Sequence, residues 1–248
     1  MPIKNEKMPR KKLVIYFLVD TSYSMEGGKI GALNNAVEEI LPMVGQISKD
    51  NNDAEIEIAV LQFSSGAKWL YSNPTPAENF SWRNLTVDGS TDFGVACTEL
   101  TAKLTTKAGG FMSSGSGSFA PVFILLSDGQ PTDSYQTPLK NLKEKNWFKA
   151  GVKIAIAIGD DANVSVLEEF TGSKESIYIV HNIEALKKII RCVAVTSSMV
   201  ASKSTDTSNE TKQEQVEKQI NADLKDEMET GEITPATGGN SIDDDWES

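Results

Sequence analysis

Histidine and cysteine are scarce in this sequence of 248 residues, which contains one histidine, His181, and two cysteines, Cys97 and Cys192. A single imidazole argues against a histidine-based metal site and against a Ser-His-Asp triad, because His181 would have to supply all of it. Two cysteines exclude a disulfide framework and a cysteine-rich zinc module. We therefore expect a cytoplasmic protein with reduced thiols.

Apolar runs are too short to cross a membrane, since a transmembrane helix needs about 20 consecutive apolar residues. Leu13–Val19 (LVIYFLV) follows a basic stretch, but it has only seven residues, stops at Asp20 and lacks a small-residue cleavage pattern. We interpret this run as a buried first strand rather than as the core of a signal peptide. The sequence thus predicts no membrane segment.

Basic residues are outnumbered, with 24 Lys and Arg against 35 Asp and Glu, a net charge of −11. The excess belongs to the end of the chain: from Ala201 onward there are four lysines and 13 acidic residues, a net charge of −9. The first 200 residues therefore carry only −2. Because no basic patch could neutralise a phosphate backbone, nucleic acid is not an expected partner.

Short apolar runs alternate with segments of helical periodicity. Strands are predicted at Leu13–Val19, Ala54–Phe63, Val122–Leu126, Val152–Ile158 and Ile177–Val180. Helices are predicted at Ile30–Ile47, Asp92–Thr106, Gln136–Ala150, Val164–Phe170 and Ile183–Val195. Pro42 should kink or break the first helix. This order predicts the α/β class: a doubly wound, mostly parallel central sheet flanked by helices, as in Rossmann-like folds.

Composition divides the chain into three parts. We expect a basic N-terminal arm at 1–12, one folded domain at 13–197, and an acidic, largely disordered tail at 198–248.

Within this tail an apolar stripe recurs every four residues, which favours a helix over 212–229. The stripe consists of Val216, Ile220, Leu224 and Met228. It could dock on a partner groove or fold back on the domain, and otherwise the tail is solvated. The final segment, residues 242–247 (IDDDWE), is either a short partner motif or a solubilising end. The acidic tail could also occupy the metal site of another copy.

Oxygen-bearing side chains cluster where three of the predicted elements meet the same edge of the sheet. Asp20, Ser22 and Ser24 directly follow the first strand, Thr91 precedes a helix, and Asp128 follows the apolar strand that ends at Leu126. Ligand sites of such sheets lie at the carboxyl ends of the strands, so these groups can converge. Carboxylate and hydroxyl oxygens suit Mg²⁺ or Mn²⁺. Ser and Asp are also common helix N-caps, which is the structural alternative for the first cluster.

The number of carboxylates decides what such a site could do. Asp20 and Asp128 bring about −2, which balances a divalent ion, and the hydroxyls are neutral. Six-coordinate oxygen geometry then leaves a position for water or for an outside group. An acidic side chain of a partner protein would be a strong ligand at that position.

The motifs D-x-S-x-S, G-x-T and S-D-G, in this order, resemble the metal-ion-dependent adhesion site of von Willebrand factor type A domains, from Leu13 to about Ser197. The resemblance implies Asp20, Ser22, Ser24 and Thr91 as ligands, Asp128 as a ligand directly or through water, and a partner that completes the coordination. Asp92, directly after Thr91, is an extra acid next to the motif.

Three stretches resemble the tellurium-resistance TerY-like group more closely: LVDTSYSM, LLSDGQPTD and VKIAIAIGDDANVSVLEEFTG. That resemblance implies a non-enzymatic cytoplasmic adaptor in a bacterial stress response, with Ser/Thr kinase-like and PP2C-type phosphatase partners.

Two other functions are compatible with the residues. One is an Mg²⁺-dependent phosphotransfer enzyme with Asp20 as nucleophile, as in haloacid-dehalogenase-like proteins, although those need an acid at the position occupied by Ser22. The other is a metal-free scaffold that acts through its surface and its tail.

Overall fold

The computed structural model describes residues 10–114, 117–159, 162–203 and 210–237. Within them, eight strands form one sheet in the order β3-β2-β1-β5-β6-β7-β8, and β4 also pairs with β2. The strands are β1 (Lys11–Asp20), β2 (Ala54–Ser64), β3 (Gly66–Trp69), β4 (Thr75–Pro76), β5 (Val122–Ser127), β6 (Val152–Ile158), β7 (Ile177–Val180) and β8 (Ile233–Pro235). The pairs β1·β2, β1·β5, β5·β6 and β6·β7 are parallel, whereas β3, β4 and β8 are antiparallel to their neighbours.

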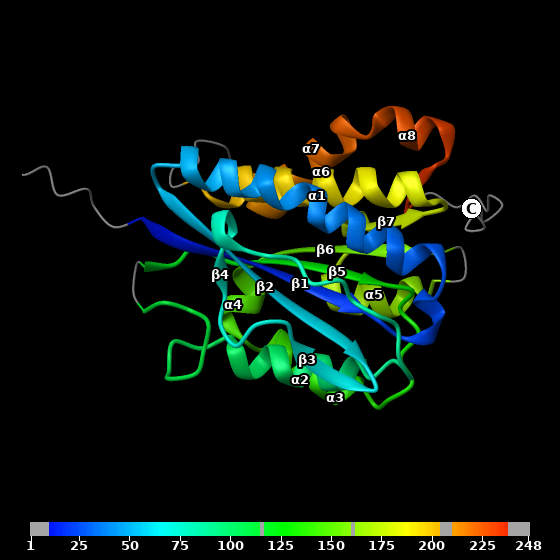
Figure 1. Cartoon of the computed structure of the whole chain (residues 1–248), viewed down its shortest axis with the longest axis horizontal. Helices are drawn as coiled ribbons and strands as arrows, with labels where there is room; N and C mark the ends of the chain where they lie inside the picture. The colour runs from blue at the N-terminus through cyan, green and yellow to red at the C-terminus, as the bar shows by residue number, and fades with distance from the viewer. Residues whose placement is uncertain (1–9, 115–116, 160–161, 204–209, 238–248) are drawn as a thin grey trace, which may run out of the picture.

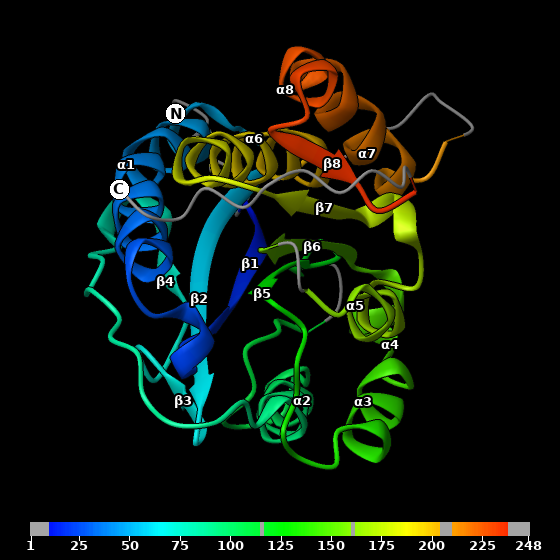
Figure 2. The ribbon, with the colours of Figure 1, turned by 90° about the vertical axis from the view of Figure 1, so that its right-hand side faces the viewer.

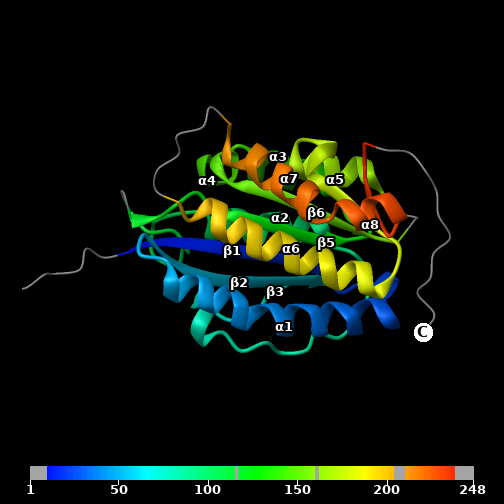
Figure 3. The same ribbon diagram turned by 90° about the horizontal axis from the view of Figure 1, so that it is seen from above.

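Helices cover both faces of the sheet. They are α1 (Gly28–Asp50), α2 (Phe93–Lys103), α3 (Gln136–Lys143), α4 (Asn146–Ala150), α5 (Val164–Thr171), α6 (Ile183–Ala201), α7 (Lys212–Asp223) and α8 (Lys225–Thr230). Figures 1 and 2 show α1, α6 and α7 on one face, and α2, α3, α4 and α5 on the other. Viewed from above, α1, α6 and α7 lie side by side over the sheet (Figure 3). The predicted doubly wound, mostly parallel α/β fold is confirmed.

The central strand β1 shows why the sheet needs two layers of helices. Its odd-numbered apolar residues belong to the core under α1 and α6, whereas Val14, Tyr16 and Leu18 belong to the core under α2 and α5. Successive side chains of a strand point to opposite faces, and residues 13–19 are at most 1% exposed. An uninterrupted apolar run is therefore the sequence signature of a strand buried on both faces.

Two of the expected helices differ in the structure. Pro42 does not end α1, which continues to Asp50. Pro42 lies on the exposed side of the helix, where water can bond the carbonyl that loses its N–H partner. The helix expected over Gln136–Ala150 is divided into α3 and α4, because Lys145 takes an extended conformation between them.

The expected disordered tail is structured over residues 211–235. Thr211 and Glu214 form a capping box that begins α7, and α8 follows after Leu224, close to the predicted helix over 212–229. Strand β8 then pairs antiparallel with β7, Ile233 lying opposite Val180. The segment folds back on the domain, and Val216, Ile220 and Leu224 of its apolar stripe become part of the core under α1 and α6. Residues 242–247 lie outside the described residues.

The contacts of this C-terminal segment are specific. Val216 and Ile220 are 0% exposed, and Leu224 is 5% exposed. The side chain of Gln213 bonds the backbone of Lys153 in both directions, accepting from its N–H at 2.8 Å and donating to its carbonyl at 3.0 Å. The hydroxyl of Ser176 donates to the buried carboxylate of Glu217.

The only histidine of the sequence also meets the C-terminal segment. His181 is buried at the end of β7, and its Nε2 lies 3.0 Å from the hydroxyl of Thr234 in β8. Among the described residues no helix is both long enough and apolar enough to cross a membrane.

Candidate metal centre

The predicted ligands lie at the edge of the sheet where the parallel strands end, on the right-hand side in Figure 1. Asp20 is the last residue of β1, and Asp128 directly follows the neighbouring strand β5. Thr91 lies two residues before α2. Asp20, Ser22, Thr91 and Asp128 are at most 5% exposed, whereas Ser24 is exposed. Asp20 and Asp128, about a hundred residues apart in the sequence, thus follow neighbouring parallel strands, and the backbone of Thr91 bonds Thr132 in the segment after Asp128.

Asp20 is held by two hydrogen bonds, one to each carboxylate oxygen. The backbone N–H of Ser22 donates to Oδ1 at 2.9 Å, and the hydroxyl of Ser127 donates to Oδ2 at 2.6 Å. Burial above all, and the nearby charge of Asp128 to a smaller extent, raise the pKa of Asp20 to about 6, although the hydrogen bonds from Ser127 and Ser22 act in the opposite direction. A buried carboxylate with a raised pKa gains stability when a cation is next to it.

Ser22 and Ser24 face each other with their hydroxyl oxygens 2.9 Å apart. They flank Tyr23 in the short 3-10 helix η1 (Tyr23–Met25). Ser22 is the N-cap residue of η1, as the structural alternative allows, but its side chain makes no capping hydrogen bond. The long helix α1 is preceded by Gly27 instead, so neither serine caps it.

Asp128 has one carboxylate oxygen with a partner and one without. Its Oδ1 accepts from the backbone N–H of Gln130 at 3.2 Å, whereas Oδ2 is buried and has no hydrogen-bond partner among the described residues. An unpaired buried carboxylate oxygen is costly, and buried charges are normally paired or bound to a metal. Asp128 therefore fits a ligand to a cation.

Thr91 is fixed by the segment that follows Asp128. Its backbone N–H donates to the hydroxyl of Thr132 at 3.0 Å, and the N–H of Thr132 donates back to the carbonyl of Thr91 at 2.9 Å. The carboxylate of Asp133 then accepts from the N–H groups of Gly94 and Val95 at the start of α2. Thr91 and Asp128 are thereby tied together.

The extra acid next to the motif serves the fold instead of the site. The carboxylate of Asp92 accepts from the backbone N–H of Gly66 at 2.7 Å and from the hydroxyl of Ser90 at 3.3 Å. It thus closes the turn between β2 and β3.

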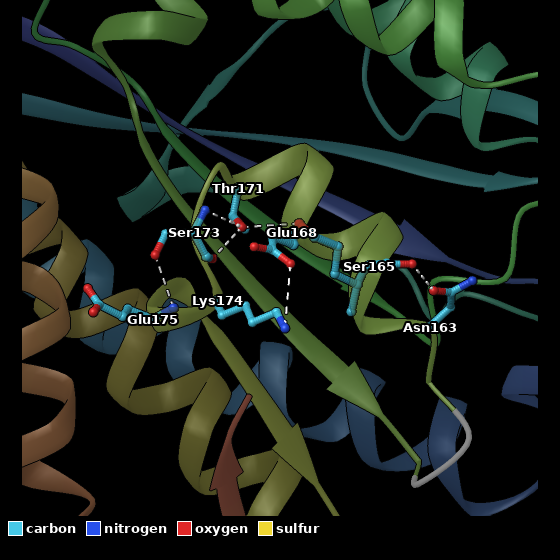
Figure 4. A network of polar contacts seen from close by, with 8 residues as sticks. Asn163, Ser165, Glu168, Thr171, Ser173, Lys174 and Glu175 are labelled. Carbon is cyan, nitrogen blue, oxygen red and sulfur yellow. Dashed lines mark hydrogen bonds and ion pairs between the residues drawn. The ribbon is translucent and has the colours of Figure 1, made fainter. Parts of the chain in front are cut away.

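Glycine at position 129 lets the loop before α5 pack directly on Asp128. Gly129 has φ +68°, and a Cβ there would lie 2.7 Å from the carbonyl oxygen of Asn163. The backbone N–H of Asn163 donates to the carbonyl of Asp128 at 2.6 Å. In Figure 4 the side chains of Asn163 and Ser165 contact each other at the start of α5, far from the Thr171 contacts at its other end.

The donor set consists of two carboxylates and three hydroxyls. The described residues contain no group of three or more His, Cys, Asp and Glu side chains that could hold a metal ion, so a site built from those residue types alone is not found in that part of the chain. Oxygen donors of this kind fit a hard divalent cation. That Asp20, Ser22, Ser24, Thr91 and Asp128 bind a metal stays a prediction. Sequence reasoning missed Ser127, which bonds the carboxylate of Asp20, and Thr132, which bonds the backbone of Thr91.

A doubly wound α/β domain with such a centre at the carboxyl ends of its strands defines a recognisable class of protein. The family model of the von Willebrand factor type A domain matches residues 15–191. The chain belongs to this family.

Solved structures share the fold at low sequence identity. A von Willebrand factor type A protein from Catenulispora acidiphila aligns with a TM-score of 0.56 and 16% identity, over 76% of this chain and 43% of that chain. Proximal thread matrix protein 1 of the mussel byssus, with a zinc-occupied MIDAS motif, aligns with a TM-score of 0.56 and 18% identity, over 75% and 48%.

The ArnB paralog VWA2 from Sulfolobus acidocaldarius aligns with a TM-score of 0.52 and 17% identity, over 75% of this chain and 46% of that chain. This chain thus spans less than half the length of these three proteins. A search of curated protein sequences finds no match.

Proposed function

We propose that this protein is a non-enzymatic protein-binding module that uses a divalent ion, Mg²⁺ or Mn²⁺, to capture an acidic residue of a partner. Asp20, Ser22, Ser24, Thr91 and Asp128 would hold the ion, as in a metal-ion-dependent adhesion site. The observation that carries this proposal is the buried, unpaired Oδ2 of Asp128 next to the buried carboxylate of Asp20. Bound there, the ion would supply a positive charge with a free coordination position.

The charge balance supports capture of an acid. Two carboxylates neutralise a divalent ion, and hydroxyl ligands add no charge, so the ion keeps its affinity for another anionic oxygen. The exposure of the proposed ligands indicates from which side a partner approaches. Ser24 is exposed, whereas the other four are buried. The partner would reach the ion over the η1 side of the site.

The sequence resemblance to the TerY-like group supports a more specific role. We infer a cytoplasmic adaptor in a stress response of the tellurite-resistance type, with kinase-like and PP2C-type phosphatase proteins as the candidate partners. The adaptor would hold such proteins together without acting on them chemically.

Metal binding and partner capture are tested on the full chain with Asp20→Ala and, as a matched control, Asp88→Ala, which alters an exposed acid near the site. Calorimetric titration with Mg²⁺ should give binding for the wild type and the control but none for Asp20→Ala. Affinity purification from the native host should recover partners that EDTA releases and that Asp20→Ala fails to retain.

Two results would contradict the proposal. One is a set of partners that is unchanged by both EDTA and Asp20→Ala. The other is sustained phosphatase turnover on generic substrates that disappears in Asp20→Ala, which would identify Asp20 as a nucleophile.

A further inference from the structure

An open groove of about 600 Å³ lies directly beside the metal centre. Gln130, Pro131, Thr132 and Tyr135 line one side of it, and Asn163 and Val166 line the other. We call it the Thr132–Asn163 groove. Both walls are bonded to the ligand segments, because Thr132 holds Thr91 and the N–H of Asn163 donates to the carbonyl of Asp128. A chain entering this groove therefore passes next to the bound ion.

The walls of the groove are fixed before any partner arrives. The ring of Tyr135 packs on that of Phe93, with ring centroids 5.9 Å apart, and its hydroxyl donates to the carboxylate of Glu169 at 3.3 Å. Asn163 is held at the start of α5 (Figure 4), where its side chain accepts from the hydroxyl of Ser165 at 2.6 Å. A preformed groove reduces the entropy lost on binding.

Tyr23 lies in η1, between the proposed ligands Ser22 and Ser24. It is 62% exposed although it is a large aromatic residue, and its backbone N–H donates to the carbonyl of Gly89 at 3.2 Å. An exposed aromatic ring between two proposed ligands is accessible to another molecule that approaches the site. Tyrosine is enriched in binding hot spots because it adds contact area at a low entropy cost.

Charge decides which chemistry this surface accepts. The described residues that line the Thr132–Asn163 groove are uncharged. A carboxylate, that of Glu169, lies at the Tyr135 end, and the exposed acid Asp88 lies on the Tyr23 side, where its N–H donates to the carbonyl of Thr21. Acidic residues on both flanks of a bound carboxylate would meet like charges, which disfavours them.

We propose that the partner presents its acidic residue on an extended segment whose flanking residues are uncharged, one flank packing on Tyr23 and the other lying in the Thr132–Asn163 groove. This inference rests on the proposed function, because the acid itself binds the ion. Tyr23 and Tyr135 then determine which acidic segments are captured. They have no part in holding the ion.

The test is a selection on the full-length protein loaded with Mg²⁺. A peptide library with one fixed central aspartate and randomised flanking positions is bound, washed and released with EDTA. In the released peptides Asp and Glu should be depleted at the flanking positions by about fivefold relative to the input library. Tyr23→Ala and Tyr135→Ala should lower the affinity of the selected peptides about fivefold while leaving Mg²⁺ affinity unchanged.

Tyr71→Ala is the matched control for Tyr135→Ala, because Tyr71 also packs on a phenylalanine, Phe80, and donates its hydroxyl to a protein oxygen, but away from the metal centre. Peptides that EDTA releases but whose flanks match the input, or whose affinity ignores both tyrosines, overturn this inference and leave the proposed function standing. If EDTA releases no more peptide from the wild type than from Asp20→Ala, the proposed function fails and this inference fails with it.

Discussion

Thr91 and Thr132 hold each other by a reciprocal pair of hydrogen bonds across 41 positions of the chain. The hydroxyl of Thr132 accepts from the N–H of Thr91, and the N–H of Thr132 donates to the carbonyl of Thr91. One loop thus positions a proposed ligand that belongs to another loop, and the proposed site depends on a residue that is not among its five proposed ligands.

We expect Thr132→Val to lower Mg²⁺ affinity about tenfold, because groups that orient a metal ligand typically contribute this much. Thr132→Ser keeps the hydroxyl and should retain most of the affinity. Calorimetric titration of the three proteins measures the difference. Equal affinities for the valine and serine variants would show that Thr132 does not position Thr91.

Asn34 holds the loop that leads to Thr91. Its buried amide donates to the carbonyl of Leu85 at 2.9 Å. The amide oxygen accepts from the indole N–H of Trp82 at 3.0 Å and from the backbone N–H of Leu85 at 2.8 Å. We expect Asn34→Ala to reduce the free energy of unfolding by about 2–3 kcal/mol, because it leaves buried polar groups unpaired. Asn35→Ala, at the adjacent exposed position, should change it little. Denaturant unfolding compares the two, and equal values would contradict the role of Asn34.

The raised pKa of Asp20 predicts how pH acts on the metal-free protein. The folded state binds this proton more tightly than the unfolded state, whose carboxyl keeps its ordinary pKa of 3.8. The contribution of Asp20 to stability is therefore complete below pH 3.8 and is lost as the pH rises through about 6.

Without metal, Asp20→Asn should thus be more stable than the wild type at pH 7.5, by about 3 kcal/mol, and nearly equally stable near pH 3.8. Mg²⁺ should reverse the order at pH 7.5, and its affinity for the wild type should fall below about pH 6. Thermal unfolding with and without Mg²⁺ at the two pH values tests this. A wild type that is the more stable protein without metal at pH 7.5 would contradict it.

Ile220 tests whether the C-terminal segment belongs to the core in solution. It lies on the buried face of α7 and is 0% exposed, so Ile220→Ala should lower the free energy of unfolding by about 2–5 kcal/mol. Asn221→Ala, one position along the same helix, is exposed and should be nearly neutral. If denaturant unfolding finds both substitutions neutral, the segment is solvated.

The convergence of the proposed ligands could be predicted because it follows from local patterns and one general rule. Leu13–Val19 and Val122–Leu126 are recognisable as buried parallel strands, and the rule that parallel strands end at the same edge then places Asp20 near Asp128. Ser22 and Ser24 are two and four residues after Asp20 in the sequence, so their hydroxyls must lie near its carboxylate. No contact between distant residues had to be known in advance.

The supporting contacts could not be predicted, since they depend on which loops pack together. Nothing near Asp133 in the sequence indicates that its carboxylate caps a helix 39 positions away from it. Strand β8 has only three residues, ends in Pro235 and is defined by its pairing with β7. Such a short segment among acidic and polar residues has no sequence pattern that predicts a strand. The sequence shows an apolar residue at every fourth position along 216–228, but it does not indicate which surface these residues pack against.

The close contact that Gly129 allows with Asn163 has a consequence for the affinities of the site for a partner segment and for the cation. Because the loop before α5 is fastened to the backbone of Asp128, a ligand that displaces Asn163 would also disturb the carboxylate beneath it. Occupation of the groove and retention of the cation would then be thermodynamically linked, each increasing or decreasing the affinity for the other by the same factor. A partner segment of the right shape would increase the affinity for the ion, and a poorly fitting one would decrease it.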